Sequence, residues 1–469
     1  MQGITTFIGG NCGFSPAPVR DWWLFSFWEY DVWDDIEPYK YYPEIIQPIS
    51  KVNEVLKEKL GITIDWKTFN DFLNKVECKG LSINYVPLVG HNTIRTAVLG
   101  RDYKRGAKPS EIEEMKSLVR EAMEAGAFGF STGLDYEPGA HASTDELIEL
   151  VKVVKEYNGI YATHWRRTGI RRERFEIKPP EKINGIVEAI EISRKTGVPV
   201  QISHIMSGYT IYPPPPPSLT VAAAKATLEV IEKALREGVD VTFDVIPNVD
   251  GGVFTVPYLA SLLSPWVKEL GSREALAEKL KMRDFREEVK EVIKSGKWWF
   301  INPKVDPYWA DKVQILQCKN EKYTGKTLSQ IAKEEDKDPL DKLFEILIED
   351  PHAKIKGFIG SEDEVVEFIK HPKAMICTDT FTFDRPWEMS KPPYFLPHPN
   401  TYGAFPRFIR RYVKELKVLG LEEAIKKMTF LPARKFKIKG RGVLKEGYYA
   451  DIVVLDFNEV SDVEDYIEP

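Results

Sequence analysis

Several residues that could bind a metal ion or move a proton follow short apolar segments of this chain. Cys12, His164, His204 and Asp379 each lie at the end of such a segment or just after it. A catalytic zinc site takes cysteine and histidine ligands and keeps one position open for water. A carboxylate near that water can accept its proton and later protonate a leaving group. These residue types therefore suggest zinc-dependent hydrolysis.

Each of these residues also has an ordinary structural interpretation. A lone cysteine in a strand is usually a small core side chain. A histidine that ends a strand is more often hydrogen-bonded than bound to a metal. An aspartate before a threonine, as at Asp379-Thr380, often caps a helix. Because all four residues fall at equivalent positions of different segments, the metal interpretation is favoured for the set.

Seven short apolar segments alternate with stretches of helical periodicity, which predicts a parallel sheet. The segments are Ile4–Gly9, Ile83–Val89, Ala127–Thr132, Ile160–His164, Val198–His204, Val239–Val245 and Ala374–Asp379. In a (β/α)₈ barrel the carboxyl ends of the strands form one catalytic face, so residues after different strands can converge. We therefore predict an α/β fold of the (β/α)₈ TIM-barrel type. A doubly wound open sheet is the alternative, but the chain lacks the Gly-x-Gly-x-x-Gly turn of its nucleotide-binding form.

Two parts of the chain are predicted to lie outside the barrel strands. About residues 250–370, before the last strand, show mixed helical patterning and are predicted to be an insertion with connecting helices. Gly440–Phe457 is predicted to be a β-hairpin that turns at Glu446-Gly447. We expect residues 1–430 to form the barrel and 431–469 to be the remnant of a small β-domain.

The composition argues against several kinds of partner. With 65 basic and 71 acidic residues the net charge is -6, which favours neither nucleic acid nor an anionic membrane surface. The chain has no apolar run of about 18 residues, so no transmembrane helix is expected. Its four cysteines form no paired motif, so a cytoplasmic protein without a disulfide framework is expected. The sequence leaves the oligomeric state open.

Eight segments, in order along the chain, carry a family resemblance. They are Gly10–Pro18 (GNCGFSPAP), Val86–Arg95 (VPLVGHNTIR), Gly126–Gly139 (GAFGFSTGLDYEPG), Tyr161–His164 (YATH), Gln201–His204 (QISH), Asp338–Asp341 (DPLD), Tyr402–Arg407 (YGAFPR) and Met428–Leu455. Together they resemble the N-acyl-D-amino-acid deacylases, or D-aminoacylases, of the metal-dependent amidohydrolase superfamily. The resemblance spans nearly the whole chain.

The resemblance implies a site and a reaction. It makes Cys12, His164 and His204 the ligands of the main Zn²⁺ ion and Asp379 the general acid and base. The implied substrate is a small molecule with a linear amide, by default an N-acyl-D-amino acid. His91 would lie behind the ligands or beside the substrate, with a purely structural role as the alternative. Arg166, on the loop after His164, could hold a substrate carboxylate, or it could pair with acidic neighbours.

The largest departure from the family lies at the start of the chain. The family carries a His-x-His on its first barrel strand, whereas none of the seven histidines here forms that motif. The chain starts just ahead of the second strand, so the barrel is expected to lack its first strand and the small β-domain its N-terminal part. A parallel barrel that is one strand short has two unpaired edges. A misplaced start or a fragment is the expected explanation, and a true open barrel is the alternative.

Three further departures surround the expected pocket. Met206 stands where the family often has a basic residue, and Ile246 stands where a tyrosine is usual. The carboxylate that usually follows the His-x-Arg motif is absent, because Arg167 follows Arg166. These changes leave the reaction class in place and make the D-amino-acid substrate the open question. The alternatives are a cyclic-amide hydrolase of the same superfamily and a catalytically silent barrel that binds a partner.

Overall fold

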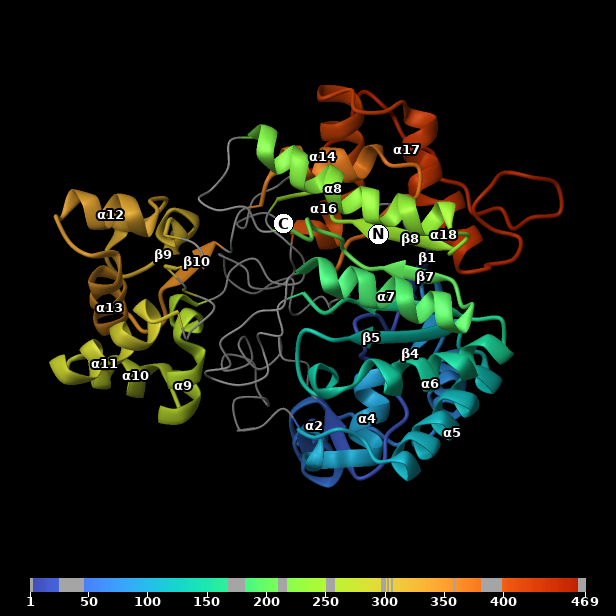
Figure 1. Cartoon of the computed structure of the whole chain (residues 1–469), viewed down its shortest axis with the longest axis horizontal. Helices are drawn as coiled ribbons and strands as arrows, with labels where there is room; N and C mark the ends of the chain where they lie inside the picture. Colours follow the sequence, from blue (N-terminus) through green and yellow to red (C-terminus); the bar gives the residue numbers. More distant parts are fainter. Residues whose placement is uncertain are drawn as a thin grey trace.

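The sheet is the centre of the fold. The computed structural model of the chain describes residues 3–24, 46–167, 182–209, 217–249, 258–296, 301, 303–304, 307–356, 360–380 and 399–462. In this part seven parallel strands form one curled sheet, about half of a barrel, in the order β1-β4-β5-β6-β7-β8-β11 (Figure 1). They are β1 (Thr6–Gly9), β4 (Asn84–Gly90), β5 (Gly129–Gly133), β6 (Ile160–His164), β7 (Val200–Ile202), β8 (Val241–Val245) and β11 (Ala374–Ile376). All seven predicted strands, and the barrel-like α/β class, are confirmed.

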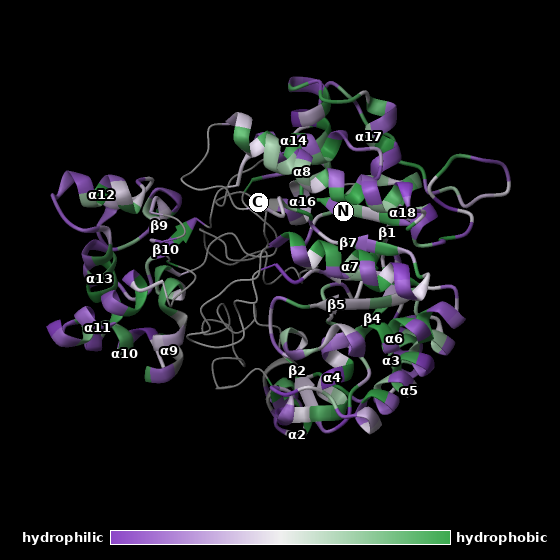
Figure 2. Cartoon of the chain, viewed as in Figure 1, coloured by the Kyte–Doolittle hydropathy of each residue, from purple (hydrophilic) through white to green (hydrophobic). Residues whose placement is uncertain are grey.

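The strands are apolar because both of their faces are buried. Every residue of β5, β6 and β7 is buried, as expected for parallel strands covered on each side. Helices follow the strands and pack beside one another. They are α5 (Pro109–Ala125), α6 (Thr144–Glu156), α7 (Lys182–Thr196), α8 (Pro217–Arg236) and α14 (Glu362–Lys370). Hydrophobic and hydrophilic residues alternate along these ribbons in Figure 2, as in helices that bury one side.

The N-cap of helix α6 lies one residue before the predicted cap. The sequence predicts Thr144 as the N-cap, but Ser143 caps the helix, because its side chain accepts a hydrogen bond from the Glu146 backbone N–H at 3.1 Å. Thr144 is the first helical residue, and its hydroxyl donates to Glu188 of α7 at 2.7 Å. Serine and threonine are both good caps, so sequence alone does not choose between neighbours.

The N-terminal region adds a small layer beside β1 and β4. It contains β2 (Trp22–Leu24) paired antiparallel with β3 (Ile46–Pro48), and the helices α2 (Ile49–Leu60), α3 (Phe69–Lys79) and α4 (His91–Leu99). Helix α4 follows β4 directly, without a loop. It therefore carries its first residues along the carboxyl edge of the sheet.

A helical lobe separates β8 from β11. It contains α9 (Ser264–Leu270), α10 (Arg273–Leu280), α11 (Arg283–Lys294), α12 (Leu328–Glu334), α13 (Pro339–Glu349) and the antiparallel pair β9 (Gln314–Gln317) and β10 (Lys354–Lys356). The lobe has a hydrophobic core of its own, which includes Trp266, Leu343 and Phe344. Figure 1 shows it in yellow and orange to one side of the sheet.

The C-terminal region differs from the prediction. Helices α16 (Pro399–Arg407), the π-helix η8 (Phe408–Glu415), α17 (Leu421–Met428) and α18 (Phe430–Lys435) lead into Gly440–Phe457, which contains no paired strand. The turn falls where predicted, since the Tyr448 N–H donates to the Lys445 carbonyl at 3.0 Å. The apolar side chains that a hairpin would bury are exposed, Leu444 at 78% and Val454 at 93%. A two-stranded hairpin with nothing to pack on has marginal stability, which explains why no ladder forms.

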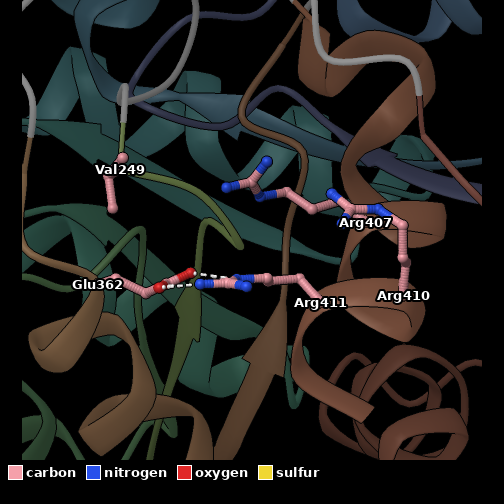
Figure 3. A pocket seen from close by; sticks show the side chains of 5 residues that line it. All are labelled: Val249, Glu362, Arg407, Arg410 and Arg411. Carbon is pink, nitrogen blue, oxygen red and sulfur yellow. Dashed lines mark hydrogen bonds and ion pairs between the residues drawn. The ribbon is translucent and has the colours of Figure 1, made fainter. Parts of the chain in front are cut away.

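Three arginines fix the end of this region to the rest of the fold. Arg407, Arg410 and Arg411 surround a pocket of about 370 Å³ together with Glu362 and Val249 (Figure 3). Arg411 forms a two-pronged ion pair with Glu362 at 2.7 and 2.8 Å. The carboxylate of Asp462 lies 2.5 Å from Arg410 and 3.8 Å from Arg407. Because Arg410 and Arg411 both donate hydrogen bonds to carboxylates, we interpret this pocket as part of a structural ion-pair network.

Candidate metal centre

Three of the predicted site residues meet at the carboxyl edge of the sheet. The candidate ligand atoms of Cys12, His164 and His204 all lie within 4.8 Å of one another. The Cys12 Sγ is 3.5 Å from the His204 Nε2, and the rings of His164 and His204 are 4.5 Å apart between centroids. They come from positions after β1, at the end of β6 and after β7, so their convergence depends on the curvature of the sheet.

Cys12 is held by a tight loop after β1. The Ser131 hydroxyl on β5 donates to the Gly10 carbonyl and accepts from the Gly13 N–H at 3.1 Å. The Tyr136 hydroxyl donates to the Cys12 carbonyl at 2.6 Å. A Cβ at Gly10 would collide with the backbone of strand β4, so only glycine permits this close approach. The Gly-Asn-Cys-Gly sequence is thus the part of the chain that lets β5 position Cys12.

His204 is held by a carboxylate from the next strand. The Oδ1 of Asp244, on β8, accepts a hydrogen bond from the His204 backbone N–H at 2.6 Å. Its Oδ2 accepts from the Gln201 side chain, also at 2.6 Å. The side-chain amide oxygen of Gln201 in turn accepts a hydrogen bond from the Thr242 hydroxyl at 2.5 Å. Asp244 therefore fixes both ends of the turn on which His204 lies.

His164 lies at the end of β6 with only 2% of its surface exposed. The Tyr136 ring packs against it edge-on, with 4.8 Å between centroids. Its Nε2 lies 3.7 Å from an Asp135 carboxylate oxygen and 2.6 Å from an N–H of Arg167. Two charged side chains of opposite sign therefore flank this imidazole.

Three predicted site residues have a strained backbone. Among the described residues, seven that are not glycine have a positive φ, and these include Cys12 at 55°, His204 at 37° and Asp379 at 47°. The left-handed region is unfavourable for residues with a Cβ, at about 1–2 kcal/mol each. Such strain persists where surrounding contacts impose it, and it concentrates at functional sites. The backbone thus marks the same residues that the sequence selects.

Asp379 follows β11, within electrostatic reach of the cluster. Burial raises the pKa of its carboxyl from 3.8 to about 6, and the positive charge of Arg167 opposes this rise. Burial and then the charge of Asp379 raise the pKa of the Cys12 thiol well above its usual range. A carboxyl group with a pKa near neutrality can exchange a proton in either direction, as a general acid and base must.

Both imidazoles are held in the neutral form. Burial, followed by the charge of Arg167, lowers the pKa of His204 to about 4. The same two causes, in that order, lower the pKa of His164 well below 6.5. A histidine binds a metal only as the neutral imidazole, so these environments favour ligation.

The donor set fits zinc. Two imidazoles and one thiol form the mixed nitrogen and sulfur set that zinc takes in catalytic sites, with room for a fourth ligand. In tetrahedral zinc sites the sulfur and nitrogen ligands lie about 3.5 Å apart, which agrees with the 3.5 Å between Cys12 and His204. The His204 Nδ1 is buried and lacks a hydrogen-bond partner in the described structure, as expected of an atom that a ligand or water must satisfy.

His91 is not brought to the cluster. It is the first residue of α4, it is fully buried, and its Nε2 lies 2.9 Å from Glu146. Glu146 also accepts hydrogen bonds from Arg95 at 2.6 and 2.7 Å. Burial raises the pKa of Glu146, but His91 and then Arg95 outweigh it and lower the pKa overall. These contacts favour the structural alternative for His91.

The two adjacent arginines after β6 have different hydrogen-bond partners. Arg166 donates to Glu188 at 3.0 Å and to the carbonyls of Ala140 and Ala142, both at 3.0 Å. These contacts correspond to the alternative in which Arg166 pairs with an acidic neighbour. Arg167, the second arginine that follows His164 in the sequence and an equal candidate there, lies beside His164 instead. Its position after a candidate ligand was the only sequence signal, and Arg166 shared it.

The sequence marks Asp244 as a polar residue at a strand end but assigns it no role, and it does not mark Tyr136 or Ser131. Asp244, Tyr136 and Ser131 bond to the backbone beside Cys12 or His204 and need not contact a substrate to matter. Asp244 had a visible signal, because it is a charged residue in an apolar strand next to the strand of His204. Ser131 and Tyr136 had none beyond their place in the Gly126–Gly139 motif.

Comparisons with known proteins place this chain beside deacylases and a family model. Residues 394–466 match the model of the amidohydrolase family. A D-aminoacylase of Alcaligenes xylosoxydans xylosoxydans is 28% identical over 469 residues, covering 100% of this chain and 75% of that relative. An N-acyl-D-aspartate deacylase of the same organism is 28% identical over 472 residues, covering 100% and 73%. The chain is also similar to the crystal structure of N-acyl-D-glutamate deacylase from Bordetella bronchiseptica, with a TM-score of 0.63 and 25% sequence identity. The match covers 100% of this chain and 76% of that chain. That structure is a complex with zinc and a phosphonate mimic of the tetrahedral intermediate.

The chain is an α/β protein with a curled parallel sheet and a cluster at its carboxyl edge, and its residues 394–466 are similar to the amidohydrolase family. It is also a homologue of the D-aminoacylases and N-acyl-D-amino-acid deacylases along all of its 469 residues. Among the described residues, no helix combines the length and the apolar composition that a membrane crossing requires.

Proposed function

We propose that this protein is a zinc-dependent hydrolase of a linear amide, which converts an N-acyl-D-amino acid to a carboxylate and a free amino acid. The observation that carries the proposal is the cluster of Cys12, His164 and His204 at the edge where the strands end. The names of the relatives that align over the whole chain support the substrate class. The zinc complex of the Bordetella deacylase supports the metal.

In this proposal Cys12, His164 and His204 hold the ion. Bound zinc supplies a water activated for attack and polarises the amide carbonyl. Asp379 moves the proton: as a carboxylate it accepts one from the attacking water, and as the acid it delivers it to the leaving nitrogen. Its pKa of about 6 suits both roles. Asp244 holds His204 in place through the backbone, and the loop after β1 does the same for Cys12.

The two alternatives receive less support. A cyclic-amide hydrolase would share the cluster, but the relatives over the whole chain are deacylases of linear amides by name. A catalytically silent barrel has no need of three candidate ligands gathered in a buried, strained site. We retain the division into a barrel of residues 1–430 and a small C-terminal part, 431–469, as part of the proposal.

The experiment compares substrates and metal on the same preparation. The chain is purified with and without added zinc, and its metal content is measured. Hydrolysis is then followed for N-acetyl-D- and N-acetyl-L-amino acids and for a cyclic amide. We expect about one zinc per chain and turnover of the D-compounds. A zinc-loaded protein that opens only the cyclic amide supports that alternative, and a metal-free, folded, inactive protein supports the silent barrel.

A further inference from the structure

Arg167 has an unusual set of neighbours for an arginine with only 15% of its side chain exposed. Its one close hydrogen bond in the described structure is to the His164 Nε2, at 2.6 Å. The carboxylate of Asp135 forms an ion pair with its Nε at 3.6 Å, too far for a hydrogen bond, and that Nε has no hydrogen-bond partner among the described residues. A guanidinium offers five donors in a planar fork, and most of these remain without an acceptor among the described residues.

The neighbouring Arg166 provides the contrast. Its donors reach a carboxylate and two backbone carbonyls, all at about 3.0 Å. Both residues follow β6, yet only the guanidinium of Arg167 turns toward the ligand cluster. Its positive charge also acts on Asp379 and His204, so it lies within the electrostatic field of the site.

We propose that Arg167 binds the carboxylate of the substrate and so makes the enzyme specific for anionic amides. The inference rests on the proposed function and adds the residue that recognises the negative charge of the substrate. An arginine fork holds a carboxylate through two parallel hydrogen bonds, and such charge-assisted pairs are the strongest that side chains form. The substrate's anion would meet donors that have no acceptor among the described residues.

The surroundings favour an anionic ligand at this position. The Met206 sulfur, 3.8 Å from Arg167 NH1, is only a weak acceptor and does not neutralise the charge. Lys182 also lies within electrostatic reach of Arg167, and the charge of each disfavours a second cation nearby. Asp135 and Asp379 offset part of this positive charge. A substrate carboxylate placed here would therefore contact Arg167 directly and interact with Lys182 at longer range.

The present partner of Arg167 is also replaceable. One lone pair of His164 Nε2 cannot both accept a hydrogen bond and bind a metal ion. Metal binding through this nitrogen would therefore release the Arg167 N–H. The metal site and the anion site would be used together, because loading the first frees a donor for the second.

The test uses a pair of substrates that differ only in charge. One is an N-acetyl-D-amino acid, and the other is the primary amide of the same compound, which lacks the carboxylate. Both are assayed with zinc-loaded full-length protein, in the wild type, in Arg167→Gln and in Arg167→Met. Arg120→Gln is the matched control, because Arg120 carries the same charge on the exposed surface of α5. Zinc content and thermal unfolding are measured for each.

We expect wild type to prefer the acid over its primary amide. Both Arg167 variants should lose at least about 30-fold in kcat/KM on the acid, mainly through KM, as when one partner of a charged pair is truncated. The same variants should lose much less on the primary amide, when both compounds are compared at a pH well above the pKa of Asp379, and Arg120→Gln should change on neither. Equal losses on both compounds, or no loss on the acid, would overturn the proposal.

Equilibrium binding separates this proposal from the proposed function. Calorimetric titration of the same two compounds into the zinc-loaded protein needs no turnover. If the protein hydrolyses neither compound but binds the acid through Arg167, the anion site stands and the deacylase activity fails. If it hydrolyses both compounds and binds them equally in wild type and variants, the deacylase activity stands and the role of Arg167 fails.

Discussion

Replacing Asp244 with asparagine tests how the site is built. The two carboxylate oxygens of Asp244 accept hydrogen bonds from the His204 backbone and the Gln201 side chain, both at 2.6 Å. Asparagine keeps the shape of aspartate but has one acceptor oxygen and one NH₂ group. One of the two donors would therefore face another donor, unless the Gln201 amide rotates to present its oxygen.

The expected loss in the free energy of unfolding follows from these contacts. A hydrogen bond to a charged acceptor contributes about 1.5–3 kcal/mol, and a buried donor left without a partner costs a similar amount. We expect Asp244→Asn to lower the free energy of unfolding by about 2 kcal/mol. His204 has a left-handed backbone held by this bond, so its imidazole should also be less well positioned. Loss of a group that orients a metal ligand typically weakens metal binding about 10–100-fold.

Two measurements check this prediction. Zinc affinity is measured by competition with a chelator, and stability by urea denaturation of the zinc-free protein. Asp240→Asn is the control, because it makes the same chemical change just before the same strand, where the side chain is 59% exposed and pairs with Lys435. We expect the control to leave zinc affinity unchanged, with any loss of stability arising from its pair with the buried Lys435. If Asp244→Asn behaves like this control, Asp244 does not position His204.

Four other outcomes are expected. Cys12→Ala should remove most of the zinc and the activity, and a variant with full zinc content would contradict the ligand assignment. Asp379→Asn should keep the zinc but slow amide hydrolysis by several orders of magnitude, because asparagine cannot carry a proton; near-normal turnover would make Asp379 structural. Because the ionised form of Asp379 accepts the proton, kcat/KM on an uncharged amide should fall as pH drops through about 6. Arg167→Gln should shift this fall in kcat/KM to higher pH, because the charge of Arg167 lowers the pKa of Asp379. If the fall does not shift, it arises from another group.

The strands of the sheet could be predicted because the residues of each strand and helix carry the pattern that defines it. Parallel strands buried on both faces must be continuous apolar runs, and helices between them must be amphipathic, so each element is visible in its own residues. The convergence of Cys12, His164 and His204 follows from the rule that strand ends share one edge of a barrel. Neither inference needs the position of any side chain.

The remaining features depend on information that local sequence does not contain. Arg166 and Arg167 have the same type and adjacent positions, and only the path of the backbone after β6 directs one toward Glu188 and the other toward His164. The Gly440–Phe457 segment has the pattern of a hairpin, but a ladder requires a surface to pack against, and exposed Val454 shows that it has none here. Tertiary contacts decide both cases.

The left-handed backbone at Cys12, His204 and Asp379 has a consequence for the divergence of related sequences. Glycine would adopt these conformations without strain, so Cys12→Gly or His204→Gly would remove the metal site and relieve a stability penalty in the same step. A lineage released from selection for hydrolysis should therefore accumulate glycine at these positions sooner than at others.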